Sequence, residues 1–113
     1  MNELTRRLSV DQPVCMGGAN PTAEELEKRI REMGYVLVKF TETQGGTELG
    51  FPLDSAATDL SAADFDKRTG AVHVEGNLNL NGDPVRCIAS IGLASLQGTG
   101  RLILEDAAGP AAQ

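Results

Sequence analysis

Residues 71–93 read AVHVEGNLNLNGDPVRCIASIGL, and this stretch decides the fold of the chain. Apolar and polar residues alternate on both sides of Asn81-Gly82-Asp83-Pro84, which is the period of a strand with one buried face. The four residues between the halves are a strong turn sequence, because asparagine, glycine and proline each favour turn geometry. The stretch therefore predicts an antiparallel hairpin with an apolar face and a polar face.

The pairing within this hairpin depends on which residues form its loop. With Gly82-Asp83 as the loop, Leu80 lies opposite Val85 and Gly76 lies opposite Ala89. Two small residues facing each other leave the sheet thin at its middle, so another element could approach closely there. The same gap leaves room for a pocket, so a packed core, which we favour, and an apolar chamber are both open.

The polar face of the hairpin carries the single histidine of the chain. In the same register His73 reaches diagonally toward Ser90, and Glu75 lies on the same face. A histidine, a carboxylate and a hydroxyl in one patch are the groups that a serine hydrolase uses. The sequence contains no nucleophile-elbow motif, and we favour the alternative, an ordinary solvated sheet face.

A second hairpin is predicted upstream. The apolar residues of 36–40 recur at every second position, and Gly45-Gly46 suits a two-residue turn. With these glycines as the loop, Phe40 faces Phe51 and the apolar residues of both strands share one face.

One helix is predicted over Asn20–Met33. Thr22 followed three residues later by Glu25 forms a capping box, and Asn20-Pro21 offers an alternative cap with proline at the first helical position. Gly34 stands where a C-terminal glycine belongs. The apolar residues at helical spacing, which predict a narrow buried stripe, are Leu26, Ile30 and Met33. We interpret the charged remainder of the helix as a solvated face.

The remaining segments complete the predicted fold. We prefer a strand to a helix for 58–66, and we expect a last strand over Arg101–Glu105 after a turn at 98–100. The N-terminus before the helix is expected to be loose. The chain is therefore predicted to be α+β, with one helix and a mainly antiparallel sheet of about five or six strands that could close like a barrel. Residues 1–106 would form this single domain and 107–113 a flexible tail.

The composition excludes several classes of function. Lys and Arg number 10 against 16 Asp and Glu, and the resulting charge of −6 is unsuited to neutralising nucleic-acid phosphates. One histidine and two separated cysteines, Cys15 and Cys87, are too few ligands for a metal centre, and no cofactor is predicted. No apolar run is long enough to span a membrane, and Met1–Val10 lacks the apolar core of a secretory signal. We therefore expect a cytoplasmic protein with free thiols.

Two resemblances follow from this layout. Residues 70–85, with the run Gly76-Asn77-Leu78-Asn79-Leu80 before the glycine turn, look like a hairpin of the YceI-type lipocalin-like proteins, which hold polyisoprenoids in a β-barrel. The whole layout, with a loose N-terminus, one helix, glycine-turned hairpins and an Ala/Gly-rich tail, is similar to that of small orphan proteins of actinobacterial polyketide gene clusters. Some of those proteins, such as the pericyclases of nargenicin- and streptoseomycin-type pathways, catalyse intramolecular cycloadditions.

The second resemblance implies a cyclase of secondary metabolism that acts on a polyketide by the shape of its pocket. No catalytic residue is assigned. The alternatives are a non-catalytic binding module for an apolar ligand, and a module that contacts a protein partner through its sheet. A small sheet with an uncovered face also favours a homo-oligomer. The candidate substrate-binding residues are Tyr35, Phe40, Phe51, His73, Asn77, Asn79 and Cys87.

Overall fold

The computed structural model describes residues 3–43 and 45–104. Within these ranges the chain forms a seven-stranded antiparallel sheet and two short α-helices, so the sheet has more strands than predicted. The helices are α1 (Glu3–Arg7) and α2 (Ala23–Lys28), and α2 continues as a π-helical turn over Arg29–Met33. The strands are β1 (Gln12–Met16), β2 (Tyr35–Phe40), β3 (Thr47–Pro52), β4 (Ala63–Asp64), β5 (Thr69–Leu80), β6 (Asp83–Gly92) and β7 (Gln97–Leu104).

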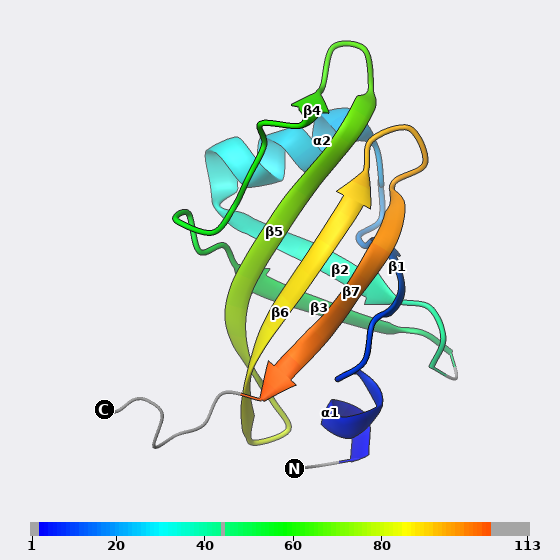
Figure 1. The fold of residues 1–113 in the computed structure, drawn as a ribbon, viewed down its shortest axis with the longest axis vertical. Coiled ribbons are helices and arrows are strands. Elements are labelled where there is room, and N and C mark those ends of the chain that lie inside the picture. Colours follow the sequence, from blue (N-terminus) through cyan, green and yellow to red (C-terminus); the bar gives the residue numbers. More distant parts are fainter. Residues whose placement is uncertain (1–2, 44, 105–113) are drawn as a thin grey trace.

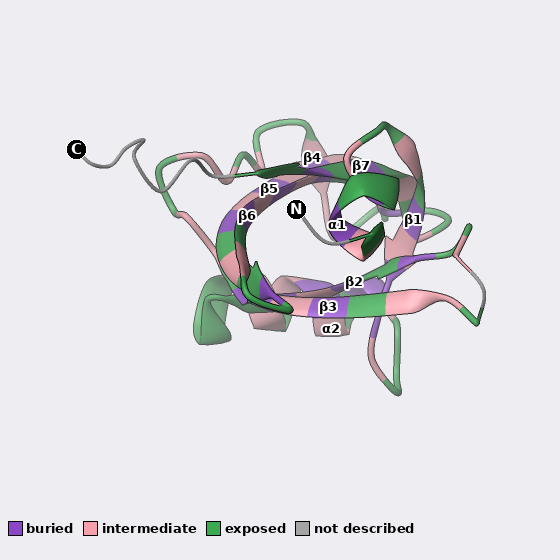
Figure 2. Ribbon diagram, turned by 90° about the horizontal axis from the view of Figure 1, so that it is seen from below, coloured by how far each residue is buried: buried purple, intermediate pink, exposed green. Residues whose placement is uncertain are grey.

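The sheet curls into a half-barrel with the strand order β3-β2-β1-β7-β6-β5-β4 (Figure 1, Figure 2). Strands β5, β6 and β7 form one long twisted wall, and β2 and β3 cross behind it (Figure 1). The two walls meet where the chain leaves β3, because the Asp54 backbone N–H donates to the Glu75 carbonyl at 2.8 Å. Helix α1 lies at one end of the molecule and α2 at the other (Figure 1).

Apolar side chains from both walls fill the interior of the curled sheet. Leu8, just after α1, and Leu26 of α2 add to this core, and both are almost fully buried. The other large side chains with almost no exposed surface are Val14, Val36, Val38, Phe40, Phe51, Val72, Val74, Ile91, Leu93 and Leu102. The inward face of the sheet is therefore a packed core, as is usual for a small domain.

The thin spot predicted at Gly76 is filled by β3. A Cβ atom on Gly76 would lie 2.1 Å from the Pro52 carbonyl oxygen and 2.5 Å from Cδ2 of Phe51. The expected close approach of another element is thus confirmed, and that element is the end of β3. Because the Phe51 ring occupies the gap, the small residue serves the closure of the sheet.

The register of the β5–β6 hairpin differs from the predicted one by two residues. Asn81 and Gly82 form the loop with φ values of 51° and 94°, and Leu80 lies opposite Asp83. A two-residue hairpin turn of this kind needs positive φ at both loop positions, which asparagine and glycine tolerate best. The predicted loop would have forced that conformation on Asp83, which precedes Pro84 and is held extended by it.

The register of β2 and β3 differs from the predicted one by four residues. Phe40 lies opposite Thr47, and Phe51 lies opposite Val36. The turn is longer than two residues and is closed by a hydrogen bond from the Gly46 N–H to the Thr43 carbonyl at 2.8 Å. Because the shift is an even number of residues, the same side chains still point into the core.

The expectation of a loose N-terminus is wrong for the described residues. Helix α1 and strand β1 lie there, and β1 occupies the middle of the sheet between β2 and β7. Strand β1 is short and contains Pro13, which lacks a backbone N–H, so its local signal is weak. Pairing with a neighbour on each side holds it in place.

The predicted turn at 98–100 is also wrong, because these residues belong to β7. A Cβ atom on Gly98 would lie 1.8 Å from the Ser90 carbonyl oxygen, so this glycine permits close contact with β6. The turn lies earlier, where Leu96 has a φ of 59°. Glu105, the predicted end of the last strand, and the predicted tail 107–113 lie outside the described residues.

The predicted Thr22 cap and the predicted C-terminal end of the central helix are confirmed, but the helix begins at Ala23 and not at Asn20. The Thr22 hydroxyl accepts from the Glu25 N–H at 3.0 Å, and Gly34 ends the helical segment with a φ of 63°. Met33 is 54% exposed rather than buried. The π-helical turn contains more residues per turn than an α-helix, and this rotates Met33 off the apolar stripe.

The preference for a strand over a helix in 58–66 is confirmed in a short form. Only Ala63–Asp64 form a strand, β4, which pairs with Thr69 and Gly70 of β5. Asp59 makes an isolated antiparallel bridge to His73, with backbone hydrogen bonds of 2.9 and 3.0 Å. This bridge pairs the segment with the edge of β5 that faces away from β6.

Candidate functional site

Three polar side chains meet on the outer face of the β5–β6 hairpin. Strand alternation points His73 and Glu75 away from the core, and the observed register sets Ser90 directly opposite His73. His73 Nε2 lies 2.6 Å from Glu75 Oε2, and His73 Nδ1 lies 3.2 Å from Ser90 Oγ. The histidine therefore joins the carboxylate to the hydroxyl.

The hydrogen-bond partners of His73 determine which of its ring nitrogens carries the proton. An ionised carboxylate can only accept, so the Nε2 atom of His73 carries the proton that is shared with Glu75. In the neutral ring Nδ1 is then an acceptor, and the Ser90 hydroxyl donates to it. The hydrogen bond from His73 is the main cause that lowers the pKa of Glu75, and Arg86 lowers it further against partial burial. Glu75 is thus kept ionised.

Arg86 anchors the trio from β6. Its Nε donates to Glu75 Oε1 at 2.9 Å, its Nη2 to Asp54 Oδ2 at 2.8 Å and its Nη1 to Asn77 Oδ1 at 3.2 Å. The hydrogen bond from Arg86 lowers the pKa of Asp54, and the bond to Asp54 in turn raises the pKa of Arg86. We call Ser90, His73, Glu75, Arg86 and Asp54 the outer-face array.

The outer-face array is partly shielded from water. The side chains of Glu75 and Arg86 are only 20% and 21% exposed, whereas that of His73 is 37% exposed and Ser90 is exposed. The Glu75–Arg86 ion pair is therefore partly buried, whereas the Ser90 hydroxyl is open to solvent. Ion pairs that are half-buried and share several hydrogen bonds hold their geometry better than exposed ones.

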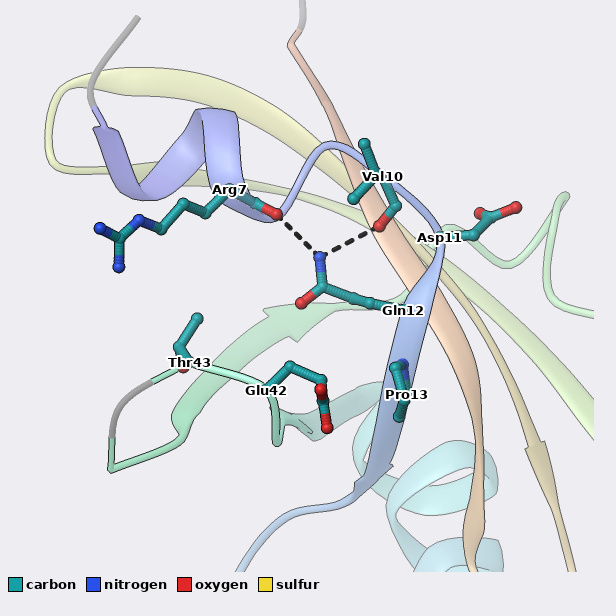
Figure 3. Close-up of a pocket in the computed structure, with 7 residues that line it drawn as sticks. All are labelled: Arg7, Val10, Asp11, Gln12, Pro13, Glu42 and Thr43. Carbon is teal, nitrogen blue, oxygen red and sulfur yellow. Dashed lines mark hydrogen bonds between the residues drawn. The ribbon is translucent and has the colours of Figure 1, made fainter.

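A separate pocket of about 460 Å³ opens between the α1–β1 connection and the loop after β2 (Figure 3). The Gln12 side chain bridges one wall, since its Nε2 donates to the Arg7 carbonyl at 2.9 Å and to the Val10 carbonyl at 3.1 Å. We call this the α1–β1 pocket. Its lining residues are Arg7, Val10, Asp11, Gln12, Pro13, Glu42 and Thr43.

A smaller pocket of about 280 Å³ continues along the outer face of β1. Pro13 lines both pockets, and the smaller one also contains the half-buried Cys15. Thr41 and Gln97 form its sides. The two pockets are therefore neighbours at Pro13.

The seven predicted substrate-binding residues do not line one pocket. Phe40, Phe51 and Cys87 lie in the core, where burial raises the pKa of the Cys87 thiol to about 12. Tyr35 lies on the outer face of β2, with its hydroxyl over Gly50.

The other three predicted residues are on the outer face of β5. His73 belongs to the outer-face array, and Asn77 touches it through Arg86. Asn79 instead accepts from the Gly82 N–H at 2.9 Å and supports the hairpin turn. The structure therefore brings together only His73 and Asn77 of the predicted set.

Arg86 and Asp54 were missed as site residues by sequence reasoning. In the predicted register Arg86 stood opposite Asn79, away from Glu75, whereas the observed register sets it opposite Asn77. Asp54 lies more than twenty positions before these residues and reaches them only because β3 crosses β5. A correct assignment of the Asn81-Gly82 turn would have revealed Arg86, but no local signal could have revealed Asp54.

No family model matches the chain, and no curated protein matches it. Within residues 3–43 and 45–104 no group of three or more His, Cys, Asp or Glu side chains is placed to hold a metal ion. None of the helices in this described part is long and apolar enough to cross a bilayer.

Proposed function

We propose that the protein binds an apolar small molecule in the α1–β1 pocket. The observation that carries this proposal is the pocket itself, a concavity of about 460 Å³ on the surface of a domain whose core is packed. Small-molecule sites are typically concave, a few hundred Å³ in size and lined by apolar walls with a few polar groups. The α1–β1 pocket is of this size, and it combines a small apolar wall with a larger number of polar and charged groups.

The walls of the pocket suggest the chemistry of the ligand. Val10 is 61% exposed, and with Pro13 it offers an apolar wall. Arg7 can donate to a ligand carbonyl or hydroxyl. Its present partner is Glu3 at 3.2 Å, and because both side chains are highly exposed this ion pair is weak and can be exchanged.

The rigid side of the pocket favours a ligand of defined shape. The two hydrogen bonds of Gln12 fix the backbone between α1 and β1, so this wall exists before a ligand arrives. A mainly apolar molecule that carries a carbonyl and a hydroxyl group matches this lining, because Arg7 can donate to the carbonyl and the carboxylates of Asp11 and Glu42 can accept from the hydroxyl.

The catalytic form of this proposal is a cyclase of a linear polyketide, as the resemblance of the sequence layout implies. A cycloaddition within one molecule needs no acid–base pair; it needs a site that holds the reacting ends close together. In the α1–β1 pocket this would fall to Val10 and Pro13, while Arg7 would bind a carbonyl group and stabilise the charge that develops on it.

Binding is tested with the apolar dye Nile red and the full chain. We expect saturable fluorescence that Val10→Glu weakens about tenfold or more, because the substitution places a charge on the apolar wall. Met33→Glu is the matched control, since Met33 is similarly exposed at 54% but lies outside the pocket. Equal dye binding by the two variants would contradict the proposal.

Catalysis is tested separately by incubating a linear polyene ester with the protein and following cyclised product by mass-resolved chromatography. Product formation that Val10→Glu abolishes and Met33→Glu preserves would support a cyclase. Dye binding without product formation from the polyene would leave a binding module and exclude the cyclase for this substrate.

A further inference from the structure

We propose that Ser90 is an activated nucleophile, and that the outer-face array transfers acyl groups from small activated esters. This site is distinct from the α1–β1 pocket, and it stands or falls independently of the proposed binding function. The inference rests on one continuous line of contacts, from the exposed Ser90 hydroxyl through His73 to the ionised Glu75.

The proton positions are the ones that base catalysis requires. Glu75 fixes the Nε2–H tautomer of His73, which leaves Nδ1 facing Ser90 Oγ at 3.2 Å. A base within hydrogen-bond reach of a hydroxyl can remove its proton as the oxygen attacks. Glu75 accepts from one ring nitrogen of His73, and the other ring nitrogen accepts from Ser90. Either ring nitrogen can act as the base, provided that it lies within hydrogen-bond reach of the serine hydroxyl.

Glu75 and Arg86 act as positioning residues. Arg86 holds Glu75 Oε1, while His73 holds Glu75 Oε2, so the carboxylate is gripped through both oxygens. Asp54 Oδ2 accepts from Arg86 Nη2 at 2.8 Å, so a second carboxylate pairs with the same guanidinium group. The negative charge beside Nε2 stabilises the imidazolium that forms when His73 takes a proton.

In the acylation step Ser90 supplies the attacking oxygen and His73 accepts its proton. Ser90 Oγ forms a bond to the acyl carbon, its proton passes to His73 Nδ1, and the bond from the acyl carbon to the leaving oxygen breaks. The proton on Nδ1 then returns to the leaving group or to solvent. In the second step His73 Nδ1 removes a proton from water as the water oxygen attacks the acyl carbon. The bond from the acyl carbon to Ser90 Oγ breaks, and the proton on Nδ1 passes to Oγ, which restores the hydroxyl and releases the carboxylic acid.

The exposed position of Ser90 makes its hydroxyl accessible to a small ester that acts as the acyl donor. Ser90 is exposed on the outer face, whereas the neighbouring Ala89 and Ile91 point into the core. The hydroxyl can therefore meet a small ester without a deep cleft. An ester with a good leaving group is the appropriate probe, because it demands little stabilisation beyond an activated oxygen.

The proposal is tested with 4-nitrophenyl acetate and the full chain, by following nitrophenolate release and locating the acetyl group by peptide mass spectrometry. We expect an acetyl group on Ser90, loss of the protein-dependent rate in Ser90→Ala, and a rate about 100-fold lower in His73→Gln. Ser55→Ala is the matched control, because it removes an exposed serine outside the array. Equal rates for Ser90→Ala and Ser55→Ala, or acetylation confined to lysines, would overturn the proposal.

The positioning role of Glu75 needs a readout that a purely structural role would not move. In Glu75→Gln the inflection of the acylation rate against pH is expected to move to lower pH, because loss of the negative charge disfavours the imidazolium form of His73. An unchanged inflection, with a folded protein by circular dichroism, would contradict this role for Glu75.

Discussion

At the scale of single residues, Gly76 shows how one side chain governs the closure of the curled sheet. The Pro52 carbonyl and the Phe51 ring occupy the space that any Cβ atom would need. Arg86 is the second such residue, because it ties β6 to β5 through Glu75 and to the end of β3 through Asp54. Both residues act across elements that are distant in the sequence.

Gly76→Ala is expected to destabilise the protein by about 1–3 kcal/mol, because the added methyl group must displace packed backbone. Gly92→Ala is the matched control in β6, where a Cβ atom would meet nothing closer than 3.5 Å. Urea unfolding of both variants checks this, and an equal midpoint for the two would contradict it.

Arg86→Met is expected to cost about 1–2 kcal/mol at pH 7, because two carboxylates lose a partly shielded hydrogen-bond donor. Arg101→Met is the control, since Arg101 meets Asp11 only at 3.7 Å in an exposed position and should change the free energy of unfolding little. Denaturant unfolding of the two variants makes the comparison.

Stability is also expected to fall in acid. The folded protein lowers the pKa of Glu75 below its ordinary 4.5 and that of Asp54 below its ordinary 3.8. A lowered carboxyl pKa contributes stability that is complete above the unfolded value and is lost as pH falls through the folded value. Urea midpoints of the wild type should therefore drop below about pH 4.5, and Arg86→Met should show a shallower drop. Parallel pH profiles would refute this linkage.

At the scale of elements, sequence patterns predicted the hairpins and the central helix but not their pairing. Alternation at 71–80 and the cap at Thr22 are local signals, and the structure confirms both elements. The registers of β5–β6 and β2–β3 were wrong by two and four residues, as the observed pairs show. Such even shifts leave the inward face unchanged, so hydrophobic patterning alone cannot detect them.

The Asn81-Gly82 turn is expected to determine the register of the outer-face array. Asn81→Val should destabilise the hairpin by about 1–2 kcal/mol, because a branched residue is strained at a φ of 51°. Asn81→Gly should be nearly neutral, since glycine adopts this conformation freely. Thermal unfolding compares the two, and similar losses would show that backbone strain is not the cause.

At the scale of the whole molecule, the N-terminal residues are part of the domain rather than an appendage. Leu8 has no exposed surface, and its carbonyl accepts from the Leu102 N–H at 2.7 Å. Strand β1 then enters the centre of the sheet and joins the β2–β3 half to the β5–β7 half. The α1–β1 pocket depends on this connection, because the chain between the two elements forms one of its walls.

Leu8→Ala is therefore expected to destabilise the protein by about 2–5 kcal/mol, the cost of a cavity in a packed core. Val10→Ala, two residues later and 61% exposed, should change stability by less than about 0.5 kcal/mol. Calorimetric unfolding distinguishes them. A small effect of Leu8→Ala would mean that α1 and its connection are not integral to the fold.

By itself, the sequence determined the type of each long element, the caps of the central helix and the residues of the two hairpins that face inward. These features depend on neighbours along the chain, such as Thr22 and Glu25 or the alternation around Val74. Only the tertiary structure decided that β1 lies at the centre of the sheet and that Asp54 and Arg86 join the trio around His73. The physical reason is that these contacts arise from the curl of the sheet, which brings β3 against β5 and depends on how all the strands pack at once.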